Sequence, residues 1–140
     1  MEYVCDAPGR KTWFRIETEA EAQLESQEMN HAVEKYFSRE RENAVQSYRP
    51  ASANSIERDI GLGAHIKREM PLFLTLRNSE GSALATAMLP PRGGDNPGFR
   101  IIIVGPGNAD PYPAEGDAIG ALGNHFNLML PRSRCFPYGR

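Results

Sequence analysis

The alternation of apolar and polar positions from Thr12 to Glu17 predicts a half-buried strand near the start of the chain. Phe14 and Ile16 fall on one side of this segment, and Arg15 falls on the other. A period of two is expected when one face of a strand packs on a core. The chain therefore enters the predicted fold as an extended segment.

A long helix is predicted directly after this strand. Thr18 and Glu21 have the spacing of a capping box, in which the Thr side chain accepts a hydrogen bond from the Glu amide and the Glu side chain accepts one from the Thr amide. The next helix-breaking residue is Pro50, so we expect one helix of about 30 residues. Such a helix lies on a sheet when its apolar positions share one face. These positions are Ala22, Met29, Ala32, Val33, Tyr36, Phe37, Ala44 and Tyr48.

The middle of the chain predicts a turn, an edge strand and a hairpin. Residues Ser55 to Glu69 fit neither the helical nor the strand period because two glycines interrupt the apolar positions, and we interpret them as a short turn and an edge strand. Leu72 to Arg77 and Ala83 to Leu89 alternate on either side of a turn that contains Gly81. This pattern is typical of a β-hairpin.

The last third of the chain adds a strand and a helix. Phe99 to Val104 is apolar on both faces, so we expect a central strand with cover on both sides. A helix is expected from Pro113, a residue type favoured in the first turn, to Pro131, which ends it. The tail from Arg132 to Tyr138 is expected to add a short edge strand.

These elements predict one α+β domain over residues 1–140, an antiparallel β-meander sheet with one long N-terminal helix and one C-terminal helix packed on it. A chain of this length buries about two thirds of its unfolded surface. With 40% hydrophobic residues it has enough apolar side chains for a core.

Charge and hydropathy limit the classes of partner. The 16 basic and 18 acidic side chains give a net charge of −2, which argues against a nucleic-acid partner. Basic and aromatic residues mix in Arg10 to Arg15 and in Arg132 to Arg140, as on single-strand binding surfaces, and this remains a lesser alternative. The longest uncharged apolar run, Ile101 to Val104, is far shorter than a membrane span, and no secretion signal is recognisable. We expect a soluble cytoplasmic protein without a membrane partner.

The spacing of cysteine and histidine residues indicates neither a metal centre nor a cofactor. Cys5 and Cys135 lie near opposite ends of the chain, and because thiols stay reduced in the cytosol we expect two separate apolar side chains rather than a disulfide. Glu28 and His31 form half of a di-iron helix motif whose second copy is missing. The helical pattern turns His31 away from the apolar stripe, so we expect it in solvent.

A glycine-rich loop before the last helix contains the candidate ligand-binding residues Gly105, Gly107, Asn108 and Asp110. Dinucleotides and phosphates bind between a strand and a helix in other folds. The third glycine of the dinucleotide fingerprint and the lysine of a P-loop are missing here, and nearby carboxylates disfavour an anion. The same carboxylates suit a hard cation, but acidic residues are normal in a first helical turn.

Glu40 and His125 are the candidate catalytic residues. Each falls on the apolar side of its own predicted helix, and the two meet if both helices pack on one sheet face. A desolvated carboxylate beside an imidazole forms a general base. A buried structural hydrogen bond, or a Glu40 that lies in water beyond the sheet, explains the same pattern.

The sequence favours a non-enzymatic binding or interaction module that self-associates as a homodimer. Trp13 and Phe73 point away from the predicted helix-covered face, which leaves the other face for a second chain. The alternative is a small enzyme or small-molecule-binding protein with a pocket bounded by the Gly105 to Pro113 loop and with Glu40 and His125 in its wall. Neither interpretation requires a cofactor.

Overall fold

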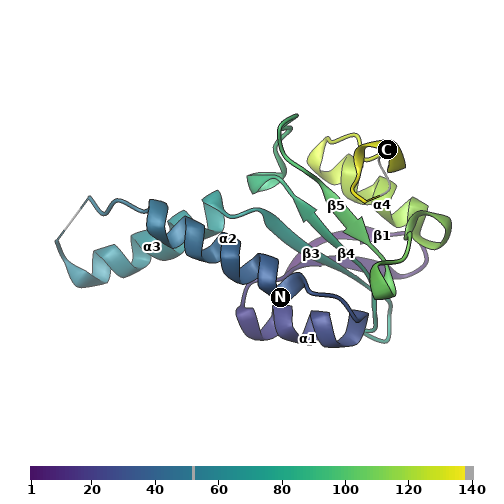
Figure 1. The fold of residues 1–140 in the computed structure, drawn as a ribbon, viewed down its shortest axis with the longest axis horizontal. Helices are drawn as coiled ribbons and strands as arrows, with labels where there is room; N and C mark the ends of the chain where they lie inside the picture. Colours follow the sequence, from purple (N-terminus) through teal and green to yellow (C-terminus); the bar gives the residue numbers. More distant parts are fainter. Residues whose placement is uncertain (52, 138–140) are drawn as a thin grey trace.

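The computed structural model describes residues 1–51 and 53–137 and shows an α+β fold. One antiparallel sheet has the strand order β1-β2-β3-β4-β5, which confirms the predicted meander. The strands are β1 (Glu2–Ala7), β2 (Lys11–Arg15), β3 (Leu72–Arg77), β4 (Ala83–Leu89) and β5 (Ile102–Val104). The helices are α1 (Glu19–Met29), α2 (Val33–Ser47), α3 (Ser55–Glu69) and α4 (Tyr112–Phe126), with 3-10 turns η1 (Pro91–Gly93), η2 (Pro106–Asn108) and η3 (Arg132–Arg134). Helices α1, α2 and α3 connect β2 to β3, and α2 and α3 extend together beyond the sheet (Figure 1).

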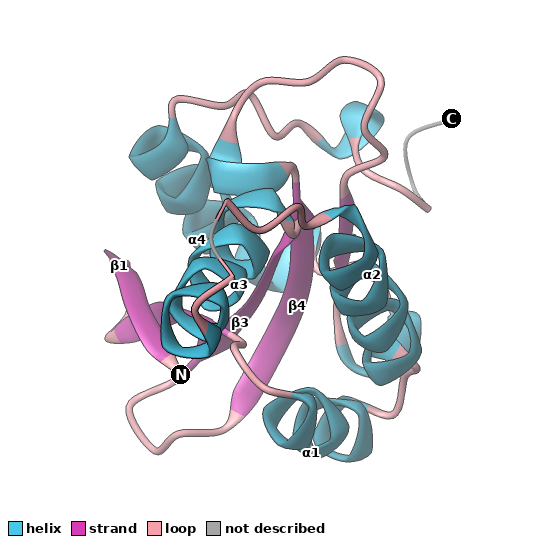
Figure 2. Cartoon of the chain, turned by 90° about the vertical axis from the view of Figure 1, so that its left-hand side faces the viewer, coloured by secondary structure: helices cyan, strands magenta, loops and turns pink. Residues whose placement is uncertain are grey.

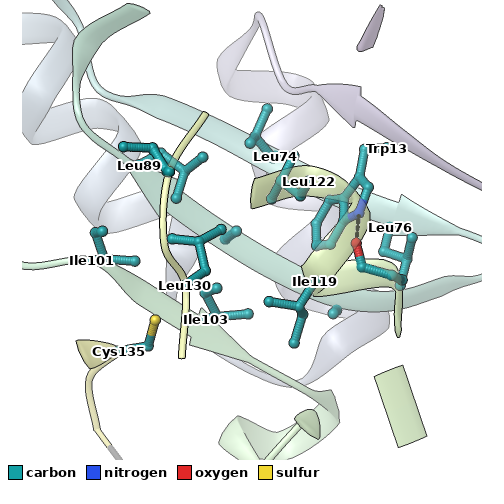
Figure 3. Packing of buried hydrophobic residues seen from close by; sticks show 14 of the residues in the cluster. Trp13, Leu74, Leu76, Leu89, Ile101, Ile103, Ile119, Leu122, Leu130 and Cys135 are labelled. Atoms are coloured by element: carbon teal, nitrogen blue, oxygen red, sulfur yellow. Dashed lines mark hydrogen bonds between the residues drawn. The ribbon is translucent and has the colours of Figure 1, made fainter. Parts of the chain in front are cut away.

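Alternation along β3 separates two hydrophobic cores on the two faces of the sheet. Leu74 and Leu76 point into the first core, which α4 covers. Trp13 also lies in this core, and its indole N–H donates a 2.8 Å hydrogen bond to the carbonyl oxygen of Ala118 in α4 (Figure 3). Phe73 points into the second core on the opposite face.

Helices α1 and α2 cover this second face. Phe73 packs edge-on against Phe37 of α2, with ring centroids 5.3 Å apart, and Ala22 of α1 and Met70 complete the contact. Figure 2 shows the sheet between α4 on one side and α1 and α2 on the other. The expectation of a sheet face left open for a second chain is therefore wrong, because the segment between β2 and β3 folds over that face.

The predicted long N-terminal helix is interrupted at Asn30. Its start is confirmed, since both hydrogen bonds of the capping box are present, from the Glu21 amide to Thr18 Oγ1 and from the Thr18 amide to Glu21 Oε1, each 3.1 Å long. Asn30 has φ 53° and ψ 57°, and α2 begins only at Val33. Asparagine adopts this left-handed region more readily than most residues, so the chain turns without a glycine or proline to mark the break.

Residues Ser55 to Glu69 form α3 rather than the predicted turn and edge strand. The side chain of Asn54 caps the helix by accepting hydrogen bonds from the amides of Ile56 (2.9 Å) and Glu57 (3.1 Å). Ile56 and Ile60 are 68% and 69% exposed. These two apolar residues point into solvent, and the next position of their stripe is Gly63, so the sequence shows no continuous apolar stripe of a buried helix.

Strand β5 lies at an edge of the sheet, so the prediction of a central strand is wrong. Ile101 and Ile103 enter the α4 core, whereas Ile102 and Val104 face the other side. The outer edge is partly covered by Phe136, whose amide donates a 2.8 Å hydrogen bond to the carbonyl oxygen of Ile101. The two-sided apolar pattern thus reflects a core on one face and a cavity on the other.

Two further segments differ from the sequence predictions. Strand β1 was not predicted, and it pairs antiparallel with β2 at the other edge of the sheet. The predicted tail strand from Arg132 to Tyr138 consists instead of η3 and a single parallel bridge between Phe136 and Ile102, while Tyr138 itself lies outside the described residues.

Candidate functional site

A cavity of about 340 Å³ lies on the side of the sheet that α1 and α2 cover. Its walls come from the start of α2, from the facing strands and from the loops after β5. Most of the lining side chains are apolar. The lining residues are His31, Ala32, Val33, Tyr36, Phe73, Thr86, Ala87, Met88, Ile102, Val104, Asn108, Phe136 and Pro137.

The break between α1 and α2 places His31 in the cavity wall. Since Asn30 turns the chain, His31 leaves the helix path and points toward β4, where its Nε2 lies 2.9 Å from Thr86 Oγ1. Its Nδ1 accepts a longer, 3.4 Å hydrogen bond from the Val33 amide. The expectation of a solvated His31 is therefore wrong, because it assumed an unbroken helix.

Thr86 connects His31 to a fully buried carboxylate. Glu25 of α1 is 0% exposed, and its Oε2 accepts a 2.5 Å hydrogen bond from Thr86 Oγ1. Its other oxygen, Oε1, lies 2.6 Å from Arg77 Nη2. A buried carboxylate is stabilised only when it is paired and hydrogen-bonded, and both conditions are met here.

The hydrogen-bond directions determine which nitrogen of His31 carries the proton. A carboxylate only accepts hydrogen bonds, so the single hydroxyl proton of Thr86 goes to Glu25. Nε2 of His31 must then donate to Thr86 Oγ1, while Nδ1 accepts from Val33. Burial lowers the pKa of His31 below its ordinary value, although the Glu25 carboxylate acts in the opposite direction. At neutral pH His31 therefore presents an uncharged, hydrogen-bonded imidazole to the cavity.

The two candidate catalytic residues do not meet. Glu40 lies on α2, where its Oε1 is 3.5 Å from Arg39 Nε. His125 is exposed near the end of α4 and contacts the ring of Phe126, with centroids 4.7 Å apart. Because α2 and α4 cover opposite faces of the sheet (Figure 2), the sheet itself separates the two side chains. The geometry therefore does not support a general base formed by this pair.

The glycine-rich loop contributes one of its four candidate residues to the cavity. Asn108 lines the wall. The amide of Gly105 donates to the carbonyl oxygen of Ala109 (2.7 Å), and Gly107 is exposed with φ 64°. Asp110 Oδ1 accepts a hydrogen bond from the Tyr112 amide (3.0 Å), which lies at the start of α4, and its Oδ2 pairs with Arg132 (2.7 Å). The first of these two contacts forms a local turn, and the second ties the loop to the segment after α4.

The cysteines and the half-motif of a metal site have ordinary surroundings. Cys5 and Cys135 are free thiols, and burial raises the pKa of each above its ordinary value. Within the described residues no group of three or more His, Cys, Asp or Glu side chains is placed to hold a metal ion. Glu28 instead accepts hydrogen bonds from the Ala83 amide and from Arg77, the latter at 3.3 Å.

Sequence reasoning missed Glu25 and Thr86, although a signal for Glu25 was present. Glu25 follows Ala22 by three residues and precedes Met29 by four, so helical spacing places it on the buried face of α1. A charged residue at such a position predicts a buried partner. No comparable signal marks Thr86, because a threonine is common in strands.

The comparisons with known proteins indicate no function for this chain, so the geometry of the site is the basis for the functional proposal. Protein-family models, curated proteins and solved structures give no match to the chain. In the part of the chain that the structure describes, no helix is long and apolar enough to cross a bilayer.

Proposed function

We propose that the protein binds a small, predominantly apolar molecule in the cavity beside His31. The observation that carries this proposal is the cavity itself, whose 340 Å³ falls in the range of ligand pockets. Apolar walls with a few placed polar groups are also typical of such pockets. Here the polar groups are His31, Thr86 and Asn108, and the first two are held in position from behind by Glu25 and Arg77.

Binding fits this site better than catalysis. Both ring nitrogens of His31 are engaged in hydrogen bonds within the protein, so neither is poised to take a proton from a ligand. The hydroxyl proton of Thr86 is likewise committed to Glu25. The network therefore fixes the shape of the wall and supplies no activated nucleophile.

A thermal-shift screen of small metabolites, with two variants, tests the proposal. Ala32 is an exposed residue that lines the cavity, so Ala32→Trp should fill the cavity without disturbing the core. Ala114 on α4 is also exposed and does not line the cavity, and Ala114→Trp serves as the control. A ligand at 100 times its Kd should stabilise the wild type by about 2.7 kcal/mol. We expect Ala32→Trp to lose this shift and Ala114→Trp to keep it; an unresponsive wild type, or equal responses in both variants, would overturn the proposal.

Self-association is a second candidate function, and α3 supports it. All of α3 lies in the described part of the chain, and none of its residues is buried. Ile56, Ile60, Gly63 and Lys67 follow each other at spacings of four, three and four residues, which places them along one helical stripe. This stripe offers a contact surface that is independent of the sheet.

The charges of α3 favour a second copy of the chain as the partner that covers this stripe, with its own α3 in antiparallel orientation. Two acidic residues, Glu57 and Asp59, outnumber Arg58 at its N-terminal end, and two basic residues, Lys67 and Arg68, outnumber Glu69 at its C-terminal end. A two-fold axis across the helix pairs each acidic end with the basic end of the other copy. Lys67 already contacts Glu2 at 2.6 Å, but its side chain is 55% exposed and is open to a second carboxylate.

Light scattering at micromolar concentration tests this dimer. We expect a mass of twice 15.6 kDa for the wild type. Ile60→Glu should give the monomer mass because it places a charge in the contact, whereas Leu24→Glu, at an exposed position of α1, should not. A wild-type mass of 15.6 kDa, or a dimer that survives Ile60→Glu, would exclude the α3 contact.

A further inference from the structure

Two aromatic side chains at the mouth of the cavity each lie beneath a guanidinium group. Tyr36 and Phe136 line the cavity and are 43% and 39% exposed, so each has one part in the wall and one part in water. Arg39 lies over the ring of Tyr36, 5.1 Å from its centroid. Arg100 lies over the ring of Phe136, 4.9 Å from its centroid. Two guanidinium groups therefore flank the entrance, the Glu34 carboxylate is near enough to the wall to act on His31, and the interior is apolar.

The two guanidinium groups differ in how far their charge is neutralised. Arg39 Nε lies 3.5 Å from a carboxylate oxygen of Glu40. No ion pair of Arg100 occurs among the described residues. Stacking on Phe136 restricts the position of the Arg100 guanidinium. A cation that is fixed in position and has no carboxylate partner is suited to bind an anion.

The interior of the cavity offers no partner for a charged group of a ligand. Its polar wall consists of the uncharged groups His31, Thr86 and Asn108, and the charge of Glu25 behind them is already paired with Arg77. Moving an ionised group into such apolar surroundings is costly. An anionic group on a ligand is therefore stable at the mouth and unstable in the interior.

We propose that the ligand is an amphipathic carboxylate, an inference that rests on the proposed binding function. Its alkyl or aryl body occupies the cavity, and its carboxylate meets Arg100 at the mouth. A guanidinium binds a carboxylate through two parallel hydrogen bonds, and the aromatic ring beneath it holds the guanidinium plane in a defined orientation. Arg39 adds a weaker attraction because Glu40 already offsets its charge.

Isothermal titration with two matched series of probes tests the inference. The first series is octanoate, decanoate and dodecanoate, and the second is the alcohols of the same chain lengths. We expect the carboxylates to bind more tightly than the alcohols. Arg100→Gln should weaken carboxylate binding about tenfold, the effect of a lost charge-assisted hydrogen bond, and should leave the alcohols unchanged. Arg100→Lys, which keeps the charge, should lose less.

Arg58→Gln is the control variant, because Arg58 is an exposed arginine on α3 and does not line the cavity. It should bind both series as the wild type does. Equal binding of alcohols and carboxylates, or an Arg100→Gln variant that still prefers carboxylates, would overturn the inference and leave the proposed binding function standing. Failure of both series would also overturn it, and the proposed function would then stand only if the metabolite screen yields another ligand that Ala32→Trp excludes.

Discussion

Glu25→Gln is the sharpest test of the network behind the cavity, because it removes a charge while keeping the shape of the side chain. Glu25 is 0% exposed and accepts hydrogen bonds from Arg77 at 2.6 Å and from Thr86 at 2.5 Å. Breaking one side of a buried ion pair costs about 3–5 kcal/mol. Arg77 keeps contacts to Glu28 (3.3 Å) and to the Gly81 carbonyl (2.9 Å), and the amide oxygen of glutamine still accepts a hydrogen bond. We therefore expect a loss of about 2–3 kcal/mol.

The measurement is equilibrium unfolding in urea, followed by circular dichroism and compared with Glu40→Gln. Glu40 is a partly exposed carboxylate on α2 with one arginine partner at 3.5 Å, so its neutralisation should cost less than about 1 kcal/mol. The slope of the free energy of unfolding against urea concentration should not change, since neither variant alters the surface that unfolding exposes. Equal losses in the two variants would refute the assignment of Glu25 as a buried, paired charge.

The same variant should change the titration of His31. The Glu25 carboxylate raises the pKa of His31, against the larger lowering by burial. Removing that negative charge should move the pKa further down, and the shift is measured by NMR titration of the imidazole. An unchanged His31 titration curve would show that the carboxylate and the imidazole are not coupled through Thr86.

Three further predictions concern the segment that positions the site. Thr18→Ala should reduce the free energy of unfolding by about 1 kcal/mol, because the amide of Glu21 loses its acceptor; a urea series measures this, and no loss would contradict the cap. Asn30→Ala should reduce the free energy of unfolding by about 1 kcal/mol because alanine is forced into the left-handed region, whereas Asn30→Gly should not reduce it. Equal effects of the two variants in urea unfolding would refute the role of the turn. The lowered pKa of His31 means that the unfolded state binds its proton at a higher pH than the folded state. The contribution of His31 to stability should therefore be constant above about pH 6.5 and decrease as the pH falls from there toward the folded-state pKa. Between about pH 7 and pH 5 the melting temperature of His31→Gln should fall less than that of the wild type. Parallel curves of melting temperature against pH would contradict this.

The sequence by itself determined the elements whose signals lie within a few residues. The capping box of Thr18 and Glu21 starts α1 as predicted, since both partners belong to one helical turn. The hairpin of β3 and β4 follows from two alternating runs on either side of a short turn. The antiparallel α+β class is confirmed as well, because consecutive strands usually pair, and here they do so even across the three helices between β2 and β3.

Helix α3 and the break at Asn30 were not predictable with the same rules. Ile56 and Ile60 point into solvent, so they do not mark a core-facing side, and the two glycines of α3 led to the prediction of a turn and an edge strand. At Asn30 a residue that is acceptable inside a helix takes a left-handed conformation. Local propensity differs too little between these outcomes, and tertiary contacts decide them: α3 packs against α2 and η1, whereas α1 and α2 pack on the sheet.

The cavity and its network were decided by the tertiary structure alone. Glu25 and Thr86 are 61 residues apart, and Arg77 lies 52 residues from Glu25. Helical spacing placed Glu25 on a buried face, but only the packing of α1 on β4 shows which side chains neutralise it. The predicted contact between Glu40 and His125 does not form, because periodicity shows that each helix buries an apolar face but does not show on which side of the sheet that face lies.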